Sequence, residues 1–303
     1  MTNFFRNYAY RIFMVLQLKF HVFDWMPDRW YISVQYYLIM GRRMRWRNPL
    51  GYHEKLNWLK IHHRRSLLTQ LVDKYAVRQY VAKKIGHQYL VPLLGRWNSA
   101  DEIDFDRLPN KFVLKCNHGS HDVTICQDKQ LLDIPAIRAN YRKWLRHNLY
   151  YAYREWPYKS VEPCIICEQF IETRSNGGMP TDYKFTCFDG NVDNVMVCME
   201  RGTGDTKFYF FDKEWHLLRY NKRGLSAPED FTLPKPEGME RMFELAAILS
   251  RGFPFVRIDL FCEEGRIYFG EMTFYPQGGY DPNILPSVDR RWGDKMNLTF
   301  DNV

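Results

Sequence analysis

The sequence lacks any apolar run long enough to cross a bilayer. Its longest uncharged apolar stretches, residues 12–18 and 31–40, fall well short of the roughly 20 residues that a transmembrane helix needs. We also expect no secretory signal peptide, because Arg6 and Arg11 interrupt the apolar opening and no small-residue cleavage site follows. We therefore expect a cytoplasmic protein whose basic, aromatic N-terminal segment either lies on the inner face of a membrane or docks on its own domain.

The chain also lacks the dense, even cysteine spacing of a disulfide scaffold. Its seven cysteines are scattered through apparent strands, which favours a reducing compartment and a role as small core residues. Cys164 and Cys167 have the CxxC form, but no second CxxC and no histidine pair accompany them. We therefore expect no zinc site.

Two common nucleotide-binding signatures are missing as well, namely the GxxxxGK[ST] loop and the GxGxxG fingerprint. What the chain does have is an excess of 43 basic over 35 acidic residues, which gives a net charge of +8 and predicts an anionic partner. Nucleotides, acidic polysaccharides, anionic membranes and nucleic acids all fit this charge. The aromatic content of 17% suits sugar rings or lipid interfaces, and 303 residues are enough for two or three lobes.

The periodicity of apolar residues predicts an α+β protein. Residues 1–95 are typical of a helical lobe. Within this lobe, the apolar spacing of residues 67–84 predicts a helix. Residues 131–158 predict a long helical region, and its basic and aromatic residues fit a packing helix better than an RNA-binding surface. Strands are expected over residues 89–97, 111–115, 161–171, 182–188, 192–199 and 207–211, and a last helix over 239–251.

An acidic connector contains Asp104 and Asp106, which form a DxD. This is the metal-binding signature of many glycosyltransferases that use sugar nucleotides. Acidic residues in a linker more often cap a helix or face solvent, so the DxD supports a glycosyltransferase only as an alternative.

Residues 111–123 predict a flexible flap made of a strand, a loop of small residues and a returning strand. Gly119 and Ser120 would let backbone amides approach a phosphate closely, and Lys115 at the end of the strand could neutralise it.

Residues 253–279 form the segment around which the rest is organised, because polar side chains interrupt two strongly apolar strands there. If the hairpin loop is the three residues 264–266, Asp259 lies opposite Glu271 and Arg257 lies opposite Thr273. Two facing carboxylates repel unless a cation lies between them, which suggests a hard ion such as Mg2+. Arg257 would then suit an anionic oxygen beside that ion. The alternative is a charged cluster on a solvent-facing sheet.

Taken together, these segments resemble the ATP-grasp superfamily and, more narrowly, the TupA-like ATP-grasp family associated with bacterial surface-polysaccharide clusters. The resemblance is carried by NPLGYHEKLNWLK, LVDKYAVRQYV, LPNKFVLKCNHGS, EWPYK, DYKFTCFDG, RIDLF and GEMTFYPQGG. It implies a helical N-terminal lobe over residues 1–95 and two α+β lobes, residues 96–167 with the flap and 168–303 with the metal-binding hairpin, that clamp a nucleotide.

The resemblance also implies roles for individual residues. ATP would be held by Lys115 and by the loop from Asn117 through His118 and Gly119 to Ser120, which closes over the phosphates. The adenine would lie against Glu168, Gln169 and Phe170, and the ribose would meet either Glu172 or Asp182. Lys184 and Arg257 would be catalytic, and Asp259, Glu271 and Thr273 would hold Mg2+, although many superfamily members carry Asn where this chain has Thr273.

The reaction that the resemblance implies is a ligation that depends on Mg2+ and ATP. A carboxylate is activated as an acyl phosphate, and an amine then attacks it to give an amide. The expected partners are ATP, an acidic glycan or sugar precursor such as a uronic acid, and an amino acid or amine, with no nucleic acid. A sugar kinase of the same fold is the close alternative.

Overall fold

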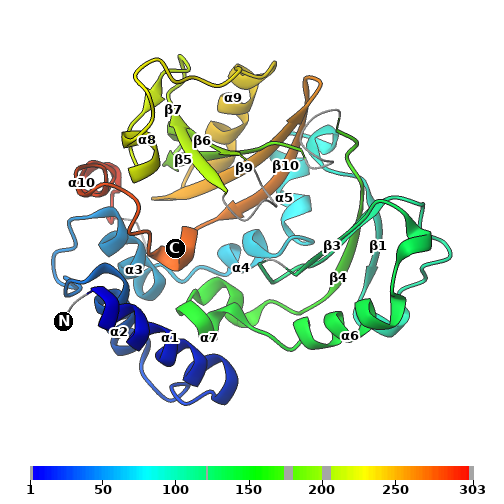
Figure 1. Cartoon of the computed structure of the whole chain (residues 1–303), viewed down its shortest axis with the longest axis horizontal. Helices are drawn as coiled ribbons and strands as arrows, with labels where there is room; N and C mark the ends of the chain where they lie inside the picture. Colours follow the sequence, from blue (N-terminus) through cyan, green and yellow to red (C-terminus); the bar gives the residue numbers. More distant parts are fainter. Residues whose placement is uncertain (1–2, 121, 174–179, 200–205, 300–303) are drawn as a thin grey trace.

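The structure is a computed structural model that describes residues 3–120, 122–173, 180–199 and 206–299. Helices and strands alternate irregularly along the chain (Figure 1). The helices are α1 (Asn3–Phe20), α2 (Asp28–Met40), α3 (Tyr52–His62), α4 (Ser66–Val72), α5 (Val77–Lys84), α6 (Ile134–Trp144), α7 (Leu149–Tyr153), α8 (Lys222–Leu225), α9 (Met239–Ser250) and α10 (Pro286–Lys295). The strands are β1 (Leu93–Trp97), β2 (Phe112–Cys116), β3 (Val123–Cys126), β4 (Ile165–Gln169), β5 (Asp182–Phe188), β6 (Asn191–Met199), β7 (Lys207–Phe211), β8 (Leu217–Leu218), β9 (Val256–Glu263) and β10 (Arg266–Thr273).

Two antiparallel sheets form separate lobes. Sheet A has the order β1-β4-β2-β3, and sheet B has the order β10-β9-β5-β6-β7-β8. Helix α6 covers sheet A, where Ile137 and Tyr141 join its core cluster. Helix α9 packs on β5, β6 and β9 of sheet B, and α4 packs against β10. The α+β class is confirmed, whereas the lobe boundaries at residues 95 and 167 stay predictions, and β1 and β4 run across them.

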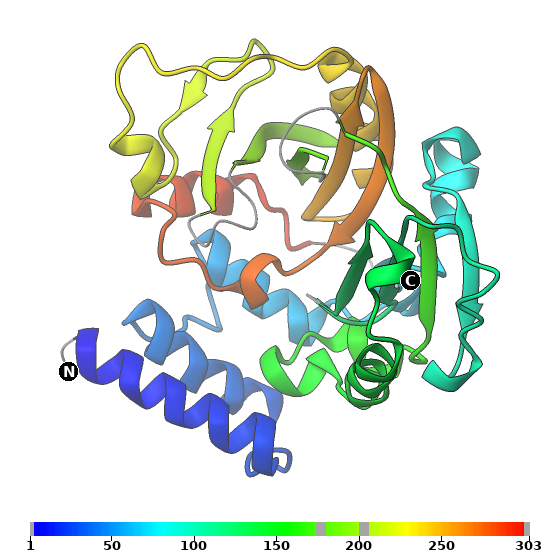
Figure 2. The ribbon, with the colours of Figure 1, turned by 45° about the vertical axis from the view of Figure 1, so that its right-hand side comes forward.

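Helices α1 and α2 lie side by side at one edge of the molecule, whereas α4 and α5 pack between the sheets: α4 contacts β10 and α5 contacts α9 (Figure 2). Helix α2 ends at Gly41, whose φ of 74° is the left-handed conformation that glycine adopts without strain. Helix α3 begins where the Glu54 carboxylate accepts hydrogen bonds from the backbone N–H groups of Leu50 and Gly51, so the first turn has its donors satisfied.

The helix expected over residues 67–84 is interrupted in the structure. Between α4 and α5 the Asp73 carboxylate accepts hydrogen bonds from the backbone N–H groups of Tyr75 and Ala76, at 2.8 and 3.1 Å. An aspartate that satisfies the free donors of a new helix start competes with helix continuation. Lys74 lies in this break, and its backbone N–H donates to the carbonyl of Asn117, which directly follows β2 of sheet A. The helical region expected over 131–158 is likewise divided, into α6, α7 and a short 3-10 turn.

All seven cysteines are free and buried, as expected for core residues. Cys164 and Cys167 follow this pattern, with Cys167 completely buried in the core of sheet A. Among the described residues, no helix is long and apolar enough to cross a membrane.

The hairpin of β9 and β10 has the predicted pairing of Asp259 with Glu271, but its loop length and its register near the loop differ from the prediction. Its loop has two residues, Glu264 and Gly265, which both have positive φ, instead of the three that we assumed. A bulge at Gly270 then shifts the register by one residue. The bulge restores the pairing of Asp259 with Glu271, so the predicted neighbours are right although the predicted loop is wrong.

This bulge depends on the absence of a side chain at residue 270. A Cβ there would lie 3.0 Å from the carbonyl oxygen of Asp259 and 3.1 Å from the ring of Phe261. We expect Gly270→Val to lower the free energy of unfolding by about 1–3 kcal/mol, because the added methyl groups overpack this contact. Urea unfolding would measure the change. Arg266→Val, at an exposed position of the same strand, is the control, and equal stability of the two variants would contradict the role of the bulge.

Candidate active site

Three strands of sheet B present the predicted metal and phosphate residues on one face. Asp259 of β9 pairs with Glu271 of β10 and with Lys184 of β5, and Arg257 pairs with Thr273. Residues directly opposite each other on neighbouring strands point to the same face of a sheet, so these five side chains are neighbours.

Arg257 lies at the centre of this group. Its Nε and Nη2 donate to the two carboxylate oxygens of Asp259 at 2.6 and 2.7 Å, a bidentate pair. Nη2 also donates to Glu271 Oε1 at 3.2 Å and to Thr273 Oγ1 at 3.1 Å. Thr273 in turn donates to Glu271 Oε1 at 3.2 Å, so the hydroxyl that we expected at the metal links the two charged side chains.

Lys184 completes the group from β5. Its Nζ lies 2.6 Å from Asp182 Oδ2 and also contacts Asp259, which is only 1% exposed. Burial raises the pKa of the Asp259 carboxyl, although Arg257 and Lys184 oppose the rise. An isolated buried carboxylate would cost several kcal/mol, so these two cations are required for the strands to fold as they do.

Lys74, from the break between α4 and α5, joins the group from outside the sheet. Its Nζ donates to the carbonyl of Gly119 at 2.6 Å and lies 4.0 Å from Glu271 Oε2. Burial acts to raise the pKa of Glu271, but the charges of Lys74, Arg257 and Lys184 outweigh burial. The net result is a pKa lowered from 4.5 to about 2. We did not assign Lys74 from the sequence, although its segment LVDKYAVRQYV carried part of the resemblance; Asp73 before it was the available sign of a helix start.

Lys115 of β2 and Glu168 of β4 meet within sheet A. Lys115 Nζ lies 2.6 Å from Glu168 Oε2, and Arg78 Nη1 of α5 lies 3.2 Å from Glu168 Oε1. Glu168, expected beside the adenine, is therefore buried between two cations, and Arg78 is a second residue that we did not predict.

The four residues of the predicted flap differ in what their side chains do. Asn117 donates to the carbonyl of Glu162 and accepts from the N–H of Cys164, and His118 contacts the carbonyl of His147. Both side chains are buried and engaged by the protein, so they are not directed at a ligand. Gly119 is buried and Ser120 is exposed, which leaves the backbone of this loop to meet a ligand.

The end of β4 and the residues after it differ in exposure. Gln169 is exposed, and its backbone N–H donates to the carbonyl of Pro92. Phe170 is buried, and Glu172 is exposed, where it pairs with Lys111 Nζ at 2.7 Å. Asp182, the other residue expected near a ribose, lies instead in the charge cluster beside Lys184.

A buried lysine and glutamate lie behind this site, and neither was predicted from the sequence. Lys60 of α3 is completely buried and donates to the carbonyls of Tyr153 and Gly278 at 2.9 and 2.6 Å. Burial lowers the pKa of Lys60 to about 7 and raises the pKa of Glu155 to about 7. The Lys60 contacts fix the turn at residues 276–279, where Gln277 and Gly278 both have positive φ.

A divalent metal fits the carboxylates if a ligand supplies the remaining oxygens. Among the described residues, no group of three or more His, Cys, Asp or Glu side chains is arranged to hold a metal ion. Mg2+, however, is commonly held by one or two carboxylates together with substrate phosphates. Asp259 and Glu271 supply two such carboxylates on adjacent strands, so the hard oxygen donors present suit Mg2+ bound with a nucleotide.

Two antiparallel α+β lobes with a cluster of cations and carboxylates between them define an ATP-grasp fold. The chain belongs to the TupA-like ATP-grasp family, whose model matches residues 54–297. No curated protein matches the sequence.

Two of the solved structures to which the chain is similar are ligases that share little sequence with it. D-alanine–D-alanine ligase from Bacillus anthracis, complexed with ATP, has 14% identity and a TM-score of 0.46, over 76% of this chain and 66% of its own. L-amino acid ligase from Bacillus licheniformis has 10% identity and a TM-score of 0.44, over 82% and 55%. This chain thus spans two thirds or less of the length of these two ligases.

The Glu155 carboxyl predicts a dependence of stability on pH. Its pKa is about 7 in the fold and 4.5 when exposed, so the folded state holds the extra proton between these values and stability falls as pH rises from 4.5 to 7. We expect Glu155→Gln to remove this fall, which amounts to at most about 3 kcal/mol. Unfolding in urea from pH 5 to 8 would measure it. Glu162→Gln, at an exposed position, is the control, and a difference between Glu155→Gln and wild type that does not vary with pH would refute the assignment.

Proposed function

We propose that this protein is a carboxylate–amine ligase that uses ATP and Mg2+. The observation that carries the proposal is the convergence of cations from sheet B and from the α4–α5 break on the Asp259–Glu271 pair. Lys184 and Arg257 contact it from sheet B, and Lys74 bridges it to the flap at Gly119. A cluster of this kind suits a bound triphosphate, whose charge the cations would neutralise.

Within this proposal, Lys115, Lys74 and the backbone of residues 117–120 bind the phosphates, and Lys184 and Arg257 hold the oxygens of the transferred phosphoryl group. Asp259 and Glu271 hold Mg2+, with Thr273 orienting Glu271 and Arg257. When bound, Mg2+ neutralises charge on the phosphates and fixes their orientation. The adenine lies along residues 168–170, with Glu172 as the ribose partner because Glu172 is exposed, whereas Asp182 is buried beside Lys184.

The chemistry then proceeds in two steps. A carboxylate oxygen of the first substrate attacks the terminal phosphorus of ATP, which gives an acyl phosphate and releases ADP. An amine next attacks the acyl carbon, loses a proton and expels phosphate, which leaves an amide. Arg257 and Lys184 stabilise the charge that develops on the phosphoryl and acyl oxygens in both steps.

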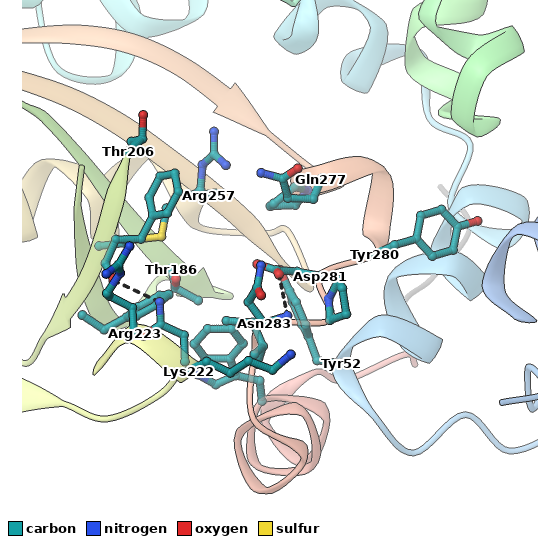
Figure 3. A pocket seen from close by; sticks show the side chains of 18 of the residues that line it. Tyr52, Thr186, Thr206, Lys222, Arg223, Arg257, Gln277, Tyr280, Asp281 and Asn283 are labelled. Atoms are coloured by element: carbon teal, nitrogen blue, oxygen red, sulfur yellow. Dashed lines mark hydrogen bonds between the residues drawn. The ribbon is translucent and has the colours of Figure 1, made fainter. Parts of the chain in front are cut away.

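The acceptor is proposed to enter a cavity that Arg257 helps to line. Its volume is about 540 Å3, a size typical of small-molecule sites. Figure 3 shows Arg257 reaching this cavity from β9 and Lys222 reaching it from α8. Phe208, Phe210 and Trp292 add aromatic surface. Cations beside aromatic rings suit an acidic sugar, which supports a uronic acid or its precursor as the carboxylate substrate.

Two alternatives have less support. A sugar kinase would use the same site with a hydroxyl as acceptor, and the products distinguish it from a ligase. A glycosyltransferase would use Asp104 and Asp106, but both are exposed, and Asp104 forms a surface ion pair with Arg107 at 3.1 Å. That contact is typical of a solvated loop.

Substitution of the metal pair tests the ATP site. We expect ATP with Mg2+ to raise the melting temperature of the wild type, and ATP with EDTA to raise it little. Glu271→Gln should abolish the Mg2+-dependent protection, because one of the two metal carboxylates is lost, and should lower ADP release at least about 100-fold.

Glu229→Gln, an exposed carboxylate on a loop, is the matched control and should behave as wild type. Protection by a UDP-sugar with no effect of Glu271→Gln would favour the glycosyltransferase. In a screen of uronic acids paired with amino acids, acceptor-dependent ADP without an amide product would favour the kinase.

Substitution of the cavity cation tests the acceptor site. We expect Lys222→Met to raise KM for an acidic acceptor about tenfold or more, because a charge-assisted hydrogen bond is lost, while protection by ATP stays unchanged. Steady-state ADP release measures KM, and the melting temperature with ATP and Mg2+ measures the protection. Lys213→Met, on an exposed turn, is the control, and an unchanged KM in Lys222→Met would place the acceptor elsewhere.

A further inference from the structure

The outer side of α1 and α2 exposes an unusual amount of apolar surface. Of the eighteen exposed large apolar side chains among the described residues, twelve lie between Phe4 and Tyr37, and we call these twelve the α1–α2 face. Phe4, Trp25 and Trp30 are each at least two thirds exposed. A concentration of this kind on one short segment marks an interaction surface, because single exposed apolar residues are otherwise scattered.

Helical spacing shows that this exposure is not a by-product of packing. Phe4, Tyr8, Ile12 and Val15 follow one another at intervals of three or four residues, so they form one stripe along α1. The opposite side of α1 is already packed, since Phe13 and Gln17 are buried and the Phe13 ring lies 5.0 Å from the Tyr31 ring of α2. Helix α1 is thus apolar on two sides, and only one of them is covered by this chain.

The charge around this face identifies the kind of surface that covers it. Residues 1–50 contain eight basic and two acidic residues, a net charge of +6 out of +8 for the whole chain. Arg11, Lys19 and Arg29 are exposed on the same helices as the apolar side chains. A second copy of the chain would bring another +6 against the first and would be repelled, whereas an anionic surface would be attracted.

We propose that the α1–α2 face docks on an anionic lipid surface. Aromatic side chains such as Trp25 and Trp30 suit the boundary between headgroups and acyl chains, and basic residues beside them suit anionic headgroups. The mode is peripheral, with α1 lying in the plane of the interface. This proposal is independent of the proposed ligase activity, because none of its residues lies in the nucleotide or acceptor sites.

Co-sedimentation of the full chain with vesicles tests the proposal. We expect binding to vesicles of equal parts phosphatidylcholine and phosphatidylglycerol, weaker binding at high salt, and little binding to phosphatidylcholine alone. Arg11→Gln with Lys19→Gln should weaken the partition coefficient roughly 25-fold, about fivefold for each charge. Phe4→Ser with Phe5→Ser should weaken it by about tenfold or more for each ring.

Control variants outside the α1–α2 face distinguish binding by this face from nonspecific binding to vesicles. Leu131→Ser with Leu225→Ser removes two exposed apolar side chains outside the face, and Lys83→Gln with Lys213→Gln removes two exposed charges; both should bind as wild type. In the wild type, brominated lipid should quench tryptophan fluorescence, and Trp25→Phe with Trp30→Phe should lose much of that quenching while still binding.

Three results would overturn the proposal. One is absence of binding to the anionic vesicles. Another is equal binding by the face variants and the control variants. The third is a lipid-free dimer that Phe4→Ser with Phe5→Ser dissociates, because the face would then be an interface between copies of the chain.

Discussion

The charge cluster on sheet B is the constraint on which the rest of the structure depends. Asp259 is buried on the central strand of the cluster, and a carboxylate in that position is tolerated only with cations on both sides. Arg257 and Lys184 meet that requirement from β9 and β5, which fixes the register of both strands. The bulge at Gly270 then aligns β10 so that Glu271 completes the group. An apolar face at this place would impose no such register.

The pairing of charges within this cluster also constrains how the proposed phosphates and Mg2+ would bind. The structure pairs Arg257 with Asp259 and brings Lys74 near Glu271, so each charge already has a partner. Phosphates and Mg2+ would have to exchange those partners, anion for anion and cation for cation, and not simply add charge to a pocket. Lys74 is well placed for such an exchange, because its other contact is the flap at Gly119. Release of that contact would remove one anchor of the flap, while Asn117 and His118 keep their own contacts to the protein.

The sequence predicted the members of this site better than their surroundings. Alternation along β9 and β10 was sufficient to place Asp259 beside Glu271. The prediction assumed a loop one residue too long and missed the bulge at Gly270, and these two register errors cancelled each other. Periodicity could not reveal that Asp73 ends one helix and begins the next, since capping competes with apolar spacing that continues through the break. Nor could it show that the Asn117 side chain turns into the protein, because that depends on a hydrogen bond from the backbone N–H of Cys164, 47 residues away along the chain.

The N-terminal helices, which were the least readable part of the sequence, are joined by hydrogen bonds to the cavity that we propose for the acceptor. Lys60 of α3 holds the carbonyl of Gly278, and the Tyr280 hydroxyl donates to Gln35 of α2 at 3.3 Å. The turn that carries these residues also lines the cavity through Gln277 and Tyr280. Helix α2 therefore contacts Tyr280, beside this turn, with one side and carries part of the α1–α2 face on the other. A surface that binds that face would fix the orientation of the cavity relative to itself, so a membrane-linked acceptor would approach from a defined direction.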